Sequence, residues 1–435
     1  MAPQATTPEA SGSAIDDDVT YADVVVVGAG PGGAAAAAHL AAKGRDVVVL
    51  EKDQFPRDKV CGDGLTPRVI QELLDLGLED EAHGRADGFK ANKGLRIHGG
   101  GTVMELPWPE LEDWPNWGGA SSRMVFDETI ARAAQRKGAQ LFENHAVTGL
   151  LWRNQAQTRV CGVSFKRADG SHGQVRAPVV IAADGAGGPV AKHLGIARRE
   201  DRPMAVAARG YYRSPLSEDE WMSSYLDLKD ADGGLLSGYG WVFPLDDGTA
   251  NVGLGLLSTS KDYQQVNYRK LLESWAGGMA DSWQTSDDNL VGRIRSYPIP
   301  MGFNRTPLHD RGVLLVGDAG GMVNPFNGEG ISYAMEAGKL AAEVIDGALT
   351  TRRTSDLQAY DRVLRERIGG YFTLGKVFTK LVGNQQIMHI CTTYGMPRRP
   401  LMQLVLKMMA HLTDRKPADA YDVILNTLQR LAPAA

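Results

Sequence analysis

Apolar and small residues near the start of the chain follow the pattern of a strand, a helix and a second strand. Residues 22–52 read ADVVVVGAGPGGAAAAAHLAAKGRDVVVLEK. Four consecutive valines are typical of a strand buried on both faces, and the alanine-rich stretch that stops at Gly44 is typical of a packed helix. A second apolar run closes on Glu51. The segment therefore predicts a βαβ unit with parallel strands.

Two later apolar runs also end in short polar turns. Residues 179–195 contain a strand of the buried type that ends at Asp184 and Gly185 and is followed by a helix. Residues 312–345 contain another strand, which ends near Asp318, then a loop rich in Gly, Asn and Pro, and then a second helix. Strands that alternate with helices predict a doubly wound α/β sheet of the Rossmann type.

In the middle of the chain, apolar and polar positions follow a different period. Residues 88–119 and 203–300 contain short runs that alternate apolar and polar positions between turn residues, which predicts a mostly antiparallel sheet packed on the α/β domain. The segment YPIPMG follows, and its two prolines, Pro298 and Pro300, are expected to end the regular ladder because proline cannot donate a backbone hydrogen bond. The chain is expected to return to the α/β domain at this point.

One strand of this region carries aromatic residues at every second position. Tyr239, Trp241 and Phe243 should share one face of the strand, while Gly238 and Gly240 lie on the other. From the residues alone, this face is either ordinary core or the wall of a channel for an apolar ligand.

The last third of the chain combines helical periodicity with positive charge. Residues 350–416 hold twelve Lys or Arg against four Asp or Glu, a local net charge of +8. Apolar residues at helical spacing beside these cations predict either a helical cap on the other domains or helices lying on anionic lipid. No apolar run reaches the roughly 20 residues needed to span a bilayer.

These patterns divide the chain into interleaved parts. The predicted parts are a disordered tail over 1–20, a nucleotide-binding domain over 21–87, 120–202 and 301–349, a domain with a mostly antiparallel sheet over 88–119 and 203–300, and a helical region over 350–435.

Composition narrows the class of protein. The 435 residues are 43% hydrophobic and 23% charged, which is ordinary for a globular chain with sizeable cores. A net charge of −5 provides no global basic field, so nucleic-acid binding is not expected. Three cysteines are too few for a disulfide framework and suit a reducing compartment, so a cytoplasmic location is predicted. No metal site and no oligomeric state are indicated.

The glycine pattern of the first unit predicts dinucleotide binding. Gly28 permits a tight turn, Gly30 lets the backbone approach a pyrophosphate, and Gly33 brings the helix against the sheet. Glu51 ends the second strand, 23 positions after Gly28, where an acid can bind the ribose hydroxyls. NAD and FAD share this first motif, so the later segments must separate them.

A cysteine follows this unit in a polar loop, FPRDKVCGDGLTP. Cys61 lies between Lys59 and the turn formed by Gly62, Asp63 and Gly64. Its thiol has three candidate roles, as proton donor, redox tuner or packing residue. A thiol with an ordinary pKa of about 8.5 is mostly protonated at neutral pH, whereas a nearby lysine favours the thiolate.

The segments that end at Asp184 and Asp318 resemble the paired DG and GD motifs of flavoprotein hydroxylases of the para-hydroxybenzoate hydroxylase type. With FPRDKVCGDGLTP, YGWVFPL and NPFNGEGI, the chain after about residue 20 is most similar to the geranylgeranyl reductase branch of that superfamily. That branch saturates carbon–carbon double bonds in polyprenyl chains. Within it the resemblance is to the bacterial enzymes that reduce one isoprene unit of the menaquinone tail.

The resemblance implies FAD as cofactor and assigns roles to single residues. Asp318 would bind the ribityl chain, Arg123 would lie beside the flavin, and Val147 would lie at the adenine. The alternative role of Asp318 is a helix N-cap, and that of Arg123 is a surface ion pair. The implied FAD-binding residues are Gly28, Gly30, Pro31, Gly32, Gly33, Glu51, Lys52, Cys61, Gly62, Asp63, Gly64, Arg123, Val147, Asp184, Gly185, Asp318, Gly328, Gly330 and Ile331.

The implied activity assigns the substrate side as well. Cys61 would be the catalytic proton donor, and Tyr239, Trp241 and Phe243 would bind the polyprenyl tail, with Trp108, Trp114 and Trp117 extending the channel. The substrate would be a polyprenyl quinone or lipid, and the C-terminal helices would hold the protein peripherally on the inner face of the cell membrane. A second G-x-G-x-x-G is absent from the sequence, so electrons would come from a transiently bound NADPH or from a ferredoxin.

Two other functions fit the same sequence. One is an oxygen-dependent aromatic hydroxylase or flavin halogenase on this fold. The halogenase signature W-x-W-x-I-P is broken here by Tyr239 and Phe243, which argues against halogenation. The other is a flavin-binding carrier or sensor without turnover.

Overall fold

A parallel sheet forms the centre of the computed structural model, which describes residues 19–229, 233–258, 263, 265–382, 384–417 and 419–433. The sheet has the strand order β19-β20-β13-β2-β3-β9, and every neighbouring pair is parallel except β19 and β20. Its strands are β2 (Val24–Val27), β3 (Val47–Leu50), β9 (Gln140–Phe142), β13 (Val179–Ala182), β19 (His309–Asp310) and β20 (Val313–Leu315). The predicted βαβ unit and its Rossmann-type sheet are confirmed.

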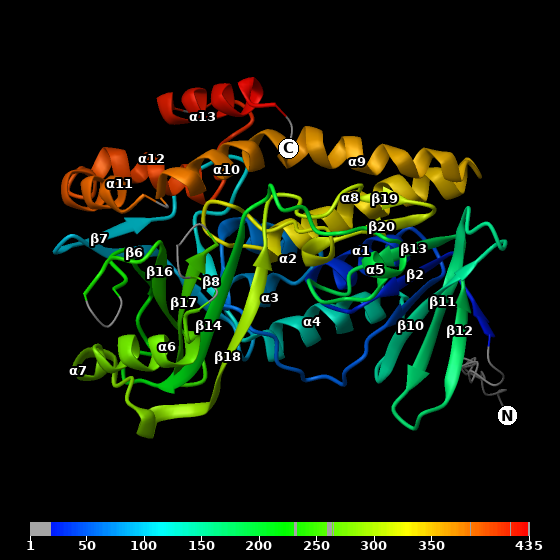
Figure 1. The fold of residues 1–435 in the computed structure, drawn as a ribbon, viewed down its shortest axis with the longest axis horizontal. Helices are drawn as coiled ribbons and strands as arrows, with labels where there is room; N and C mark the ends of the chain where they lie inside the picture. The colour runs from blue at the N-terminus through cyan, green and yellow to red at the C-terminus, as the bar shows by residue number, and fades with distance from the viewer. Residues whose placement is uncertain are drawn as a thin grey trace, which may run out of the picture.

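Helices cover this sheet closely because the facing side chains are small (Figure 1). The helices around it are α1 (Pro31–Ala42), α4 (Arg123–Arg136), α5 (Val190–His193) and α8 (Ile331–Thr350). All four valines of β2 are at most 4% exposed. A Cβ on Gly338 of α8 would lie 2.4 Å from the carbonyl oxygen of Gly32 in α1, so these two helices touch through their backbones. A Cβ on Gly32 would also lie 2.9 Å from the carbonyl oxygen of Ala334, so the first turns of α1 and α8 lie side by side.

A second, seven-stranded sheet stands beside the first (Figure 1). Its order is β18-β14-β17-β16-β15-β6-β7, and only the β15–β6 pair is parallel. Its strands are β6 (Gly94–Gly99), β7 (Thr102–Pro107), β14 (Met204–Arg213), β15 (Trp221–Tyr225), β16 (Gly238–Pro244), β17 (Thr249–Leu257) and β18 (Leu290–Pro300), with α6 (Tyr268–Gly277) and α7 (Ala280–Trp283) against one face. The predicted fold class, a parallel sheet with a mostly antiparallel partner, is confirmed.

The expectation that two prolines end the ladder is wrong. Pro298 pairs with Val206 and Pro300 with Met204, so β18 runs through both prolines. The physical reason is the position of β18 at the sheet edge, where a residue without an N–H can turn its nitrogen side away from the neighbouring strand.

Two smaller sheets complete the β structure. The three-stranded sheet β4-β8-β5 consists of β4 (Gly64–Leu65), β8 (Gly118–Ala120) and β5 (Lys90–Asn92), and it joins the turn after Cys61 to the strand that precedes β6. The four-stranded sheet consists of β1 (Val19–Tyr21), β12 (His172–Arg176), β11 (Val160–Arg167) and β10 (His145–Trp152). Helices α2 (Pro67–Asp75) and α3 (Glu79–Ala82) follow β4 directly.

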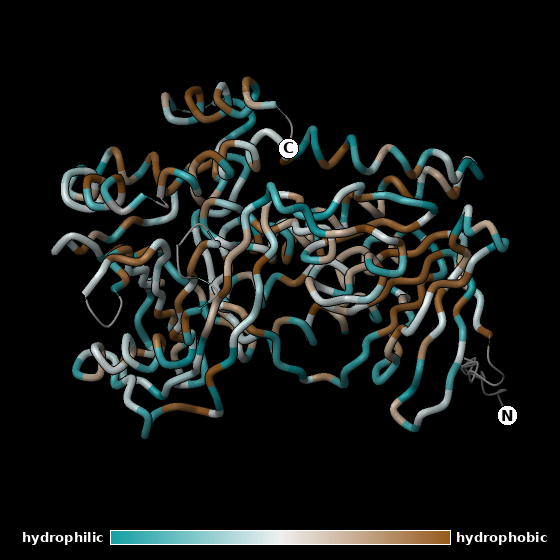
Figure 2. The backbone as a smooth tube through the Cα atoms, viewed as in Figure 1, coloured by the Kyte–Doolittle hydropathy of each residue, from teal (hydrophilic) through white to brown (hydrophobic). Residues whose placement is uncertain are grey.

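The last third of the chain is helical and lies across the other elements (Figure 1). Its α-helices are α9 (Ala359–Leu364), α10 (Gly370–Val382), α11 (Gln385–Ile390), α12 (Arg399–Met409) and α13 (Ala420–Leu431). Tyr371, Phe372 and Leu406 are at most 3% exposed, so these helices do cap the core. Hydrophobic segments nevertheless also reach the outer side of this layer (Figure 2). None of the helices in the described ranges has the length and apolarity to cross a bilayer.

Candidate flavin site

The glycine-rich loop between β2 and α1 is shaped by three different constraints. Gly28 has φ +95°, and a Cβ there would lie 2.5 Å from the carbonyl oxygen of Ala183. A Cβ on Gly33 would lie 2.0 Å from the carbonyl oxygen of Gly28. Gly30 differs, because its nearest neighbour would be Nη2 of Arg57 at 3.9 Å. This open position at the N-terminus of α1 leaves the backbone accessible to a phosphate group.

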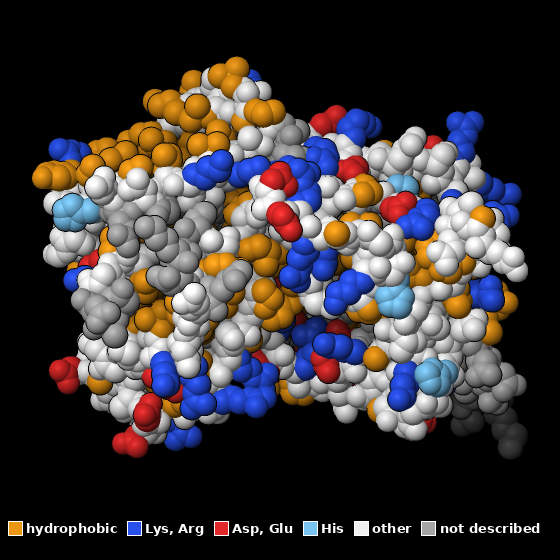
Figure 3. Space-filling view, in the orientation of Figure 1, with side chains coloured by type: hydrophobic (Ala, Val, Ile, Leu, Met, Phe, Trp, Pro, Cys, Tyr) orange, Lys and Arg blue, Asp and Glu red, His pale blue; other side chains and the backbone are white. Residues whose placement is uncertain are grey.

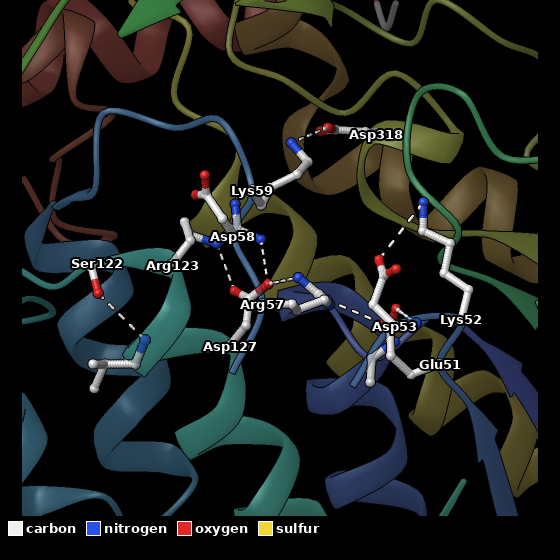
Figure 4. A network of polar contacts seen from close by, with 12 residues as sticks. Glu51, Lys52, Asp53, Arg57, Asp58, Lys59, Ser122, Arg123, Asp127 and Asp318 are labelled. Carbon is white, nitrogen blue, oxygen red and sulfur yellow. Dashed lines mark hydrogen bonds and ion pairs between the residues drawn. The ribbon is translucent and has the colours of Figure 1, made fainter. Parts of the chain in front are cut away.

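A buried chain of charges runs from this loop to α4 (Figure 4). Oε2 of Glu51 accepts hydrogen bonds from the backbone N–H of Ala29 at 2.9 Å and from Nη2 of Arg57 at 3.2 Å. Nη1 of Arg57 donates to Asp127 at 2.8 Å. Arg57 was missed in the sequence, where it is one basic residue in a charged loop, and only the fold shows that it faces Gly30.

Arg123 completes this chain at the first turn of α4. It donates to both carboxylate oxygens of Asp127, at 2.5 and 2.8 Å, and it is only 6% exposed, which rules out the alternative of a surface ion pair. Burial lowers the pKa of Arg123, but the Asp127 carboxylate outweighs burial and raises it above the ordinary value, with a further contribution from Cys61. A permanent positive charge therefore lies beside the Cys61 thiol.

Asp318 lies at the end of the parallel sheet, opposite the lysine of the cysteine loop (Figure 4). Its Oδ2 is 3.6 Å from Nζ of Lys59, and its Oδ1 is 3.6 Å from the position of a Cβ on Gly330. The helix α8 begins at Ile331 without a side-chain cap, so Asp318 is not the N-cap of this helix. Burial lowers the pKa of Lys59, although Asp318 opposes the shift, and its ammonium also lies 3.8 Å from the ring centre of Tyr297.

The structure places four other predicted cofactor residues around the edge of the site. Oδ2 of Asp184 accepts from the backbone N–H of Val190 at 2.9 Å, which closes the turn that contains Gly185. Val147 lies in β10, partly buried against the core beneath the sheet. The side chain of Lys52 is 73% exposed and pairs only weakly with Asp53, so it points away from the buried network.

The Cys61 turn is held from below by one asparagine. Nδ2 of Asn251 donates to the carbonyl oxygen of Cys61 and to Oδ2 of Asp63, both at 2.8 Å. Oδ1 of Asn251 accepts from the indole N–H of Trp241 at 2.9 Å, and Tyr211 donates to Asp63 at 2.7 Å. This largely buried network fixes the turn against the seven-stranded sheet.

Asp63 supports this turn from a buried position, and its Oδ1 has no hydrogen-bond partner among the described residues. Its side chain is completely buried and its φ is +64°, the left-handed region that residues other than glycine rarely adopt. Burial raises the pKa of Asp63 to about 6, against the opposing effect of the hydrogen bond from Tyr211. The carboxyl group thus supports the turn that presents Cys61.

The aromatic strand β16 faces this turn. A Cβ on Gly62 would lie 3.3 Å from both Phe243 and Trp241, and a Cβ on Gly64 would lie 3.0 Å from Phe243. The ring centres of Trp241 and Phe243 are 6.3 Å apart, and Tyr239 lies 5.9 Å from Trp241. All three rings share the face that points to the Cys61 turn, whereas the opposite face of Gly240 meets Trp275.

The loop before α8 meets the same wall. The Tyr239 hydroxyl donates to the carbonyl oxygen of Asn327 at 2.6 Å, and Thr66 donates to Oε1 of Glu329 at 2.7 Å. Burial raises the pKa of Glu329 above its ordinary value. Gly328, with φ +77°, turns the backbone toward the start of α8. Glu329 was missed as a site residue, since the motif NPFNGEGI indicates a turn but not what its glutamate contacts.

These residues fit FAD. The open backbone at Gly30 and the guanidinium of Arg57 suit a pyrophosphate, and Asp318 offers carboxylate oxygens to a sugar-like chain. The N-terminus of α8 directs partial positive charge to the same space, which favours an anionic reduced flavin. Cys61, Arg123 and the aromatic wall then lie on the far side of that space.

Comparison with known proteins agrees with this geometry. Residues 21–368 match the family described as FAD binding domain. The chain is 36% identical over 398 residues to a menaquinone reductase of Mycobacterium tuberculosis, covering 92% of each chain. It is 31% identical to the digeranylgeranylglycerophospholipid reductase of Methanocella arvoryzae, over 91% of this chain and 96% of the relative.

Solved structures share the fold. A geranylgeranyl bacteriochlorophyll reductase-like protein of Thermoplasma acidophilum superposes with a TM-score of 0.73 at 21% identity, over 94% of this chain and all of that one. A flavin-dependent brominase superposes with a TM-score of 0.71 at 21% identity, over 94% of this chain and 99% of that one. At such identities the likeness shows the fold alone. By sequence and site geometry, the chain belongs to the FAD-binding domain family and, within it, to the geranylgeranyl reductase family of FAD-dependent oxidoreductases.

Proposed function

We propose that the protein saturates a carbon–carbon double bond in a polyprenyl chain, with the isoprenoid tail of menaquinone as its substrate. The observation that carries this proposal is the aromatic wall of β16 facing the Cys61 turn across the flavin site. Three rings on one face of β16 suit an isoprenoid chain. The similarity to menaquinone reductases over nearly the whole chain supports the choice of tail.

Different residues of the chain would bind the cofactor and the substrate tail. Asp318 would hold the ribityl chain of FAD, and Arg57 with the α1 N-terminus would hold the pyrophosphate. Bound and reduced FAD supplies a hydride to one carbon of the double bond. Tyr239, Trp241 and Phe243 would orient the tail and keep water from the reacting carbons.

The second hydrogen arrives as a proton. An isolated alkene is not electrophilic, so hydride addition needs a proton at the other carbon. In this proposal, the S–H bond of Cys61 breaks and a C–H bond forms on the substrate. The negative charge left on Sγ lies beside Arg123, whose charge stabilises it until solvent returns a proton. Asn251 holds the Cys61 backbone in place during the transfer.

The source of electrons is part of the proposal. The single G-x-G-x-x-G motif is used by FAD, so the donor would be NADPH bound transiently without its own Rossmann site, or a ferredoxin. Anaerobic reduction of the flavin by NADPH in a stopped-flow mixer, compared with reduction by ferredoxin, identifies the donor.

The C-terminal helices provide access to lipid. Val377 and Leu381 of α10 are 55% and 48% exposed. We define the apolar C-terminal surface by its exposed side chains, Val377, Leu381, Ile390, Tyr394, Leu401, Val423, Ile424, Leu428 and Leu431. Figure 3 shows apolar side chains gathered over α11 to α13. Exposed cations such as Lys380, Arg398 and Arg399 flank this surface, so we propose peripheral binding to the anionic inner face of the cell membrane.

An anaerobic turnover experiment tests the activity. FAD-loaded protein, reduced with dithionite, should saturate one double bond of menaquinone. After the ring has been reoxidised to the quinone in air, mass spectrometry should detect a product heavier by two hydrogens. An oxygen-dependent hydroxylase or halogenase would leave the tail unchanged without air, and a flavin carrier would leave it unchanged under any condition. An unchanged tail under both aerobic and anaerobic conditions overturns the proposal.

A further inference from the structure

A cleft of about 790 Å³ lies where strands β5 to β7 meet helices α12 and α13. Three indoles line it, those of Trp108, Trp117 and Trp221, together with Leu406 and Tyr421. Indole faces stack on planar aromatic groups. The lining of the cleft therefore suits a ring-containing ligand.

One wall of the cleft carries an unused hydrogen-bond donor. Asn92 is 6% exposed, and its Oδ1 accepts from the indole N–H of Trp108 at 2.7 Å. Because an indole nitrogen can only donate, this contact fixes the orientation of the amide. Nδ2 of Asn92 then has no hydrogen-bond partner among the described residues. A buried donor of this kind calls for an acceptor from a ligand.

The cations that line the cleft are paired, and carboxylates outnumber them. Lys93 pairs with Glu220, and Nζ of Lys407 lies 2.8 Å from Asp419 and 2.9 Å from Asp422, while Glu110 also lines the cleft. A phosphate-bearing head group would meet these carboxylates and no unpaired cation among the described residues. The ligand that fits is therefore not an anion.

The cleft is close to the Cys61 turn. Leu65 pairs with Gly119, which pairs with Ala91, so Asn92 and the end of the turn are separated by two inter-strand spacings, or about 10 Å. Trp108 also belongs to the apolar cluster that contains Met222 and Phe243, and Met222 lies against Gly64. Contiguous apolar packing thus connects the cleft to the aromatic wall.

We propose that this cleft binds the fused quinone ring of the substrate, with Nδ2 of Asn92 donating to a ring carbonyl oxygen. The tail would then pass Trp108 and reach the Cys61 turn within its first few isoprene units. The cleft would therefore determine which head group binds and which double bond of the tail is reduced. This inference rests on the proposed function.

Binding of tailless naphthoquinone to the oxidised, FAD-loaded protein tests the site without turnover. Asn92→Asp keeps the acceptor for Trp108 and loses the donor, so calorimetry at pH 8 should show binding weakened by about tenfold. Trp221→Leu should weaken it as well through lost stacking. Asn154→Asp, on the exposed turn between β10 and β11, is the matched control and should bind like the wild type. Equal affinity in all four proteins overturns the inference.

Turnover separates this inference from the proposed function. In the Asn92→Asp variant, KM for menaquinone should rise by about tenfold while the parameters for a polyprenol without a ring stay unchanged. An equal change for both substrates overturns the quinone site but leaves polyprenyl reduction standing. Wild-type protein that binds naphthoquinone and reduces neither substrate overturns the proposed function instead.

Discussion

Asn251 donates a hydrogen bond to the carbonyl oxygen of Cys61 across 190 positions of sequence, at 2.8 Å. The same amide accepts from Trp241, so one buried side chain fixes both the cysteine turn and the wall that faces it. The distance between thiol and wall is therefore determined by the second sheet, not by the loop that carries the cysteine.

Replacing Asn251 by leucine should destabilise the protein by about 3 kcal/mol, because the Cys61 carbonyl, Asp63 and the Trp241 indole lose their buried partner. Urea unfolding followed by circular dichroism gives the free energy. Asn154→Ala, at an exposed turn, should change it by less than about 0.5 kcal/mol. A leucine variant as stable as this control would show that the network contributes nothing.

The Cys61→Ser variant should bind FAD normally and reduce the alkene about a hundredfold or more slowly, since a hydroxyl is a much weaker acid than a thiol. Formation of the saturated tail in a single turnover, quenched and analysed by mass spectrometry after the ring has been reoxidised in air, reports the step directly. Cys161→Ser, in β11, is the control and should retain the wild-type rate. An unchanged rate of tail reduction in the Cys61 variant would make the thiol a packing residue.

Removing the carboxylate in Asp318→Ala should weaken FAD binding by about tenfold to a hundredfold, the effect of one lost hydrogen bond to a charged group. The ratio of flavin to protein absorbance after dialysis, followed by titration of the apoprotein with FAD, measures this loss. Asp310→Ala removes a carboxylate that pairs with Arg311 beside the same sheet. Should both variants retain FAD equally, Asp318 would have no part in holding the cofactor.

The pH dependence of stability should differ between the wild type and Asp63→Asn. Burial raises the pKa of Asp63 to about 6 from 3.8, so the folded state holds this proton more tightly than the unfolded chain. The contribution of Asp63 is then fully present below about pH 4 and is lost as the pH rises through 6, a change of about 3 kcal/mol.

Burial also lowers the pKa of His39 to about 4, which produces the opposite trend in the same range. The informative quantity is therefore the difference between the two proteins in free energy of unfolding, measured from about pH 4 to about pH 7. A difference that stays constant across that range would contradict the shift at Asp63.

Charges placed on α13 should reduce membrane binding. Ile424 and Leu428 are 46% and 44% exposed, so the double variant with aspartate at both positions should fold normally but sediment less with anionic vesicles. Val291→Asp adds one charge at an exposed site on β18 and should bind vesicles like the wild type. Equal sedimentation of all three proteins would place the membrane contact elsewhere.

Features that depend on neighbours in sequence could be predicted. The spacing of Gly28, Gly30 and Gly33 specifies a turn and a helix start, and the period of two in β16 places its three aromatic rings on one face. Each pattern reflects local backbone geometry, which a short stretch of sequence determines almost completely.

Features that depend on tertiary contacts could not be predicted from the sequence. Arg57 becomes part of the site because β3 and α4 bring Glu51 and Asp127 to it. Asn92 becomes a candidate binding residue because Trp108 donates to its Oδ1 and leaves Nδ2 without a partner among the described residues. The prediction that the prolines of β18 end the ladder was wrong because no neighbouring residue in the sequence indicates that the strand lies at a sheet edge.

The order of the strands in the parallel sheet has a consequence for synthesis. Strand β20 and helix α8, which bring Asp318 and the second helix N-terminus to the site, come more than 280 positions after the glycine loop at Gly28. A nascent chain on the ribosome therefore exposes the first half of the nucleotide site long before the second half exists. Cofactor loading must wait until most of the polypeptide has been released into solution, and the earlier strands need shielding until then.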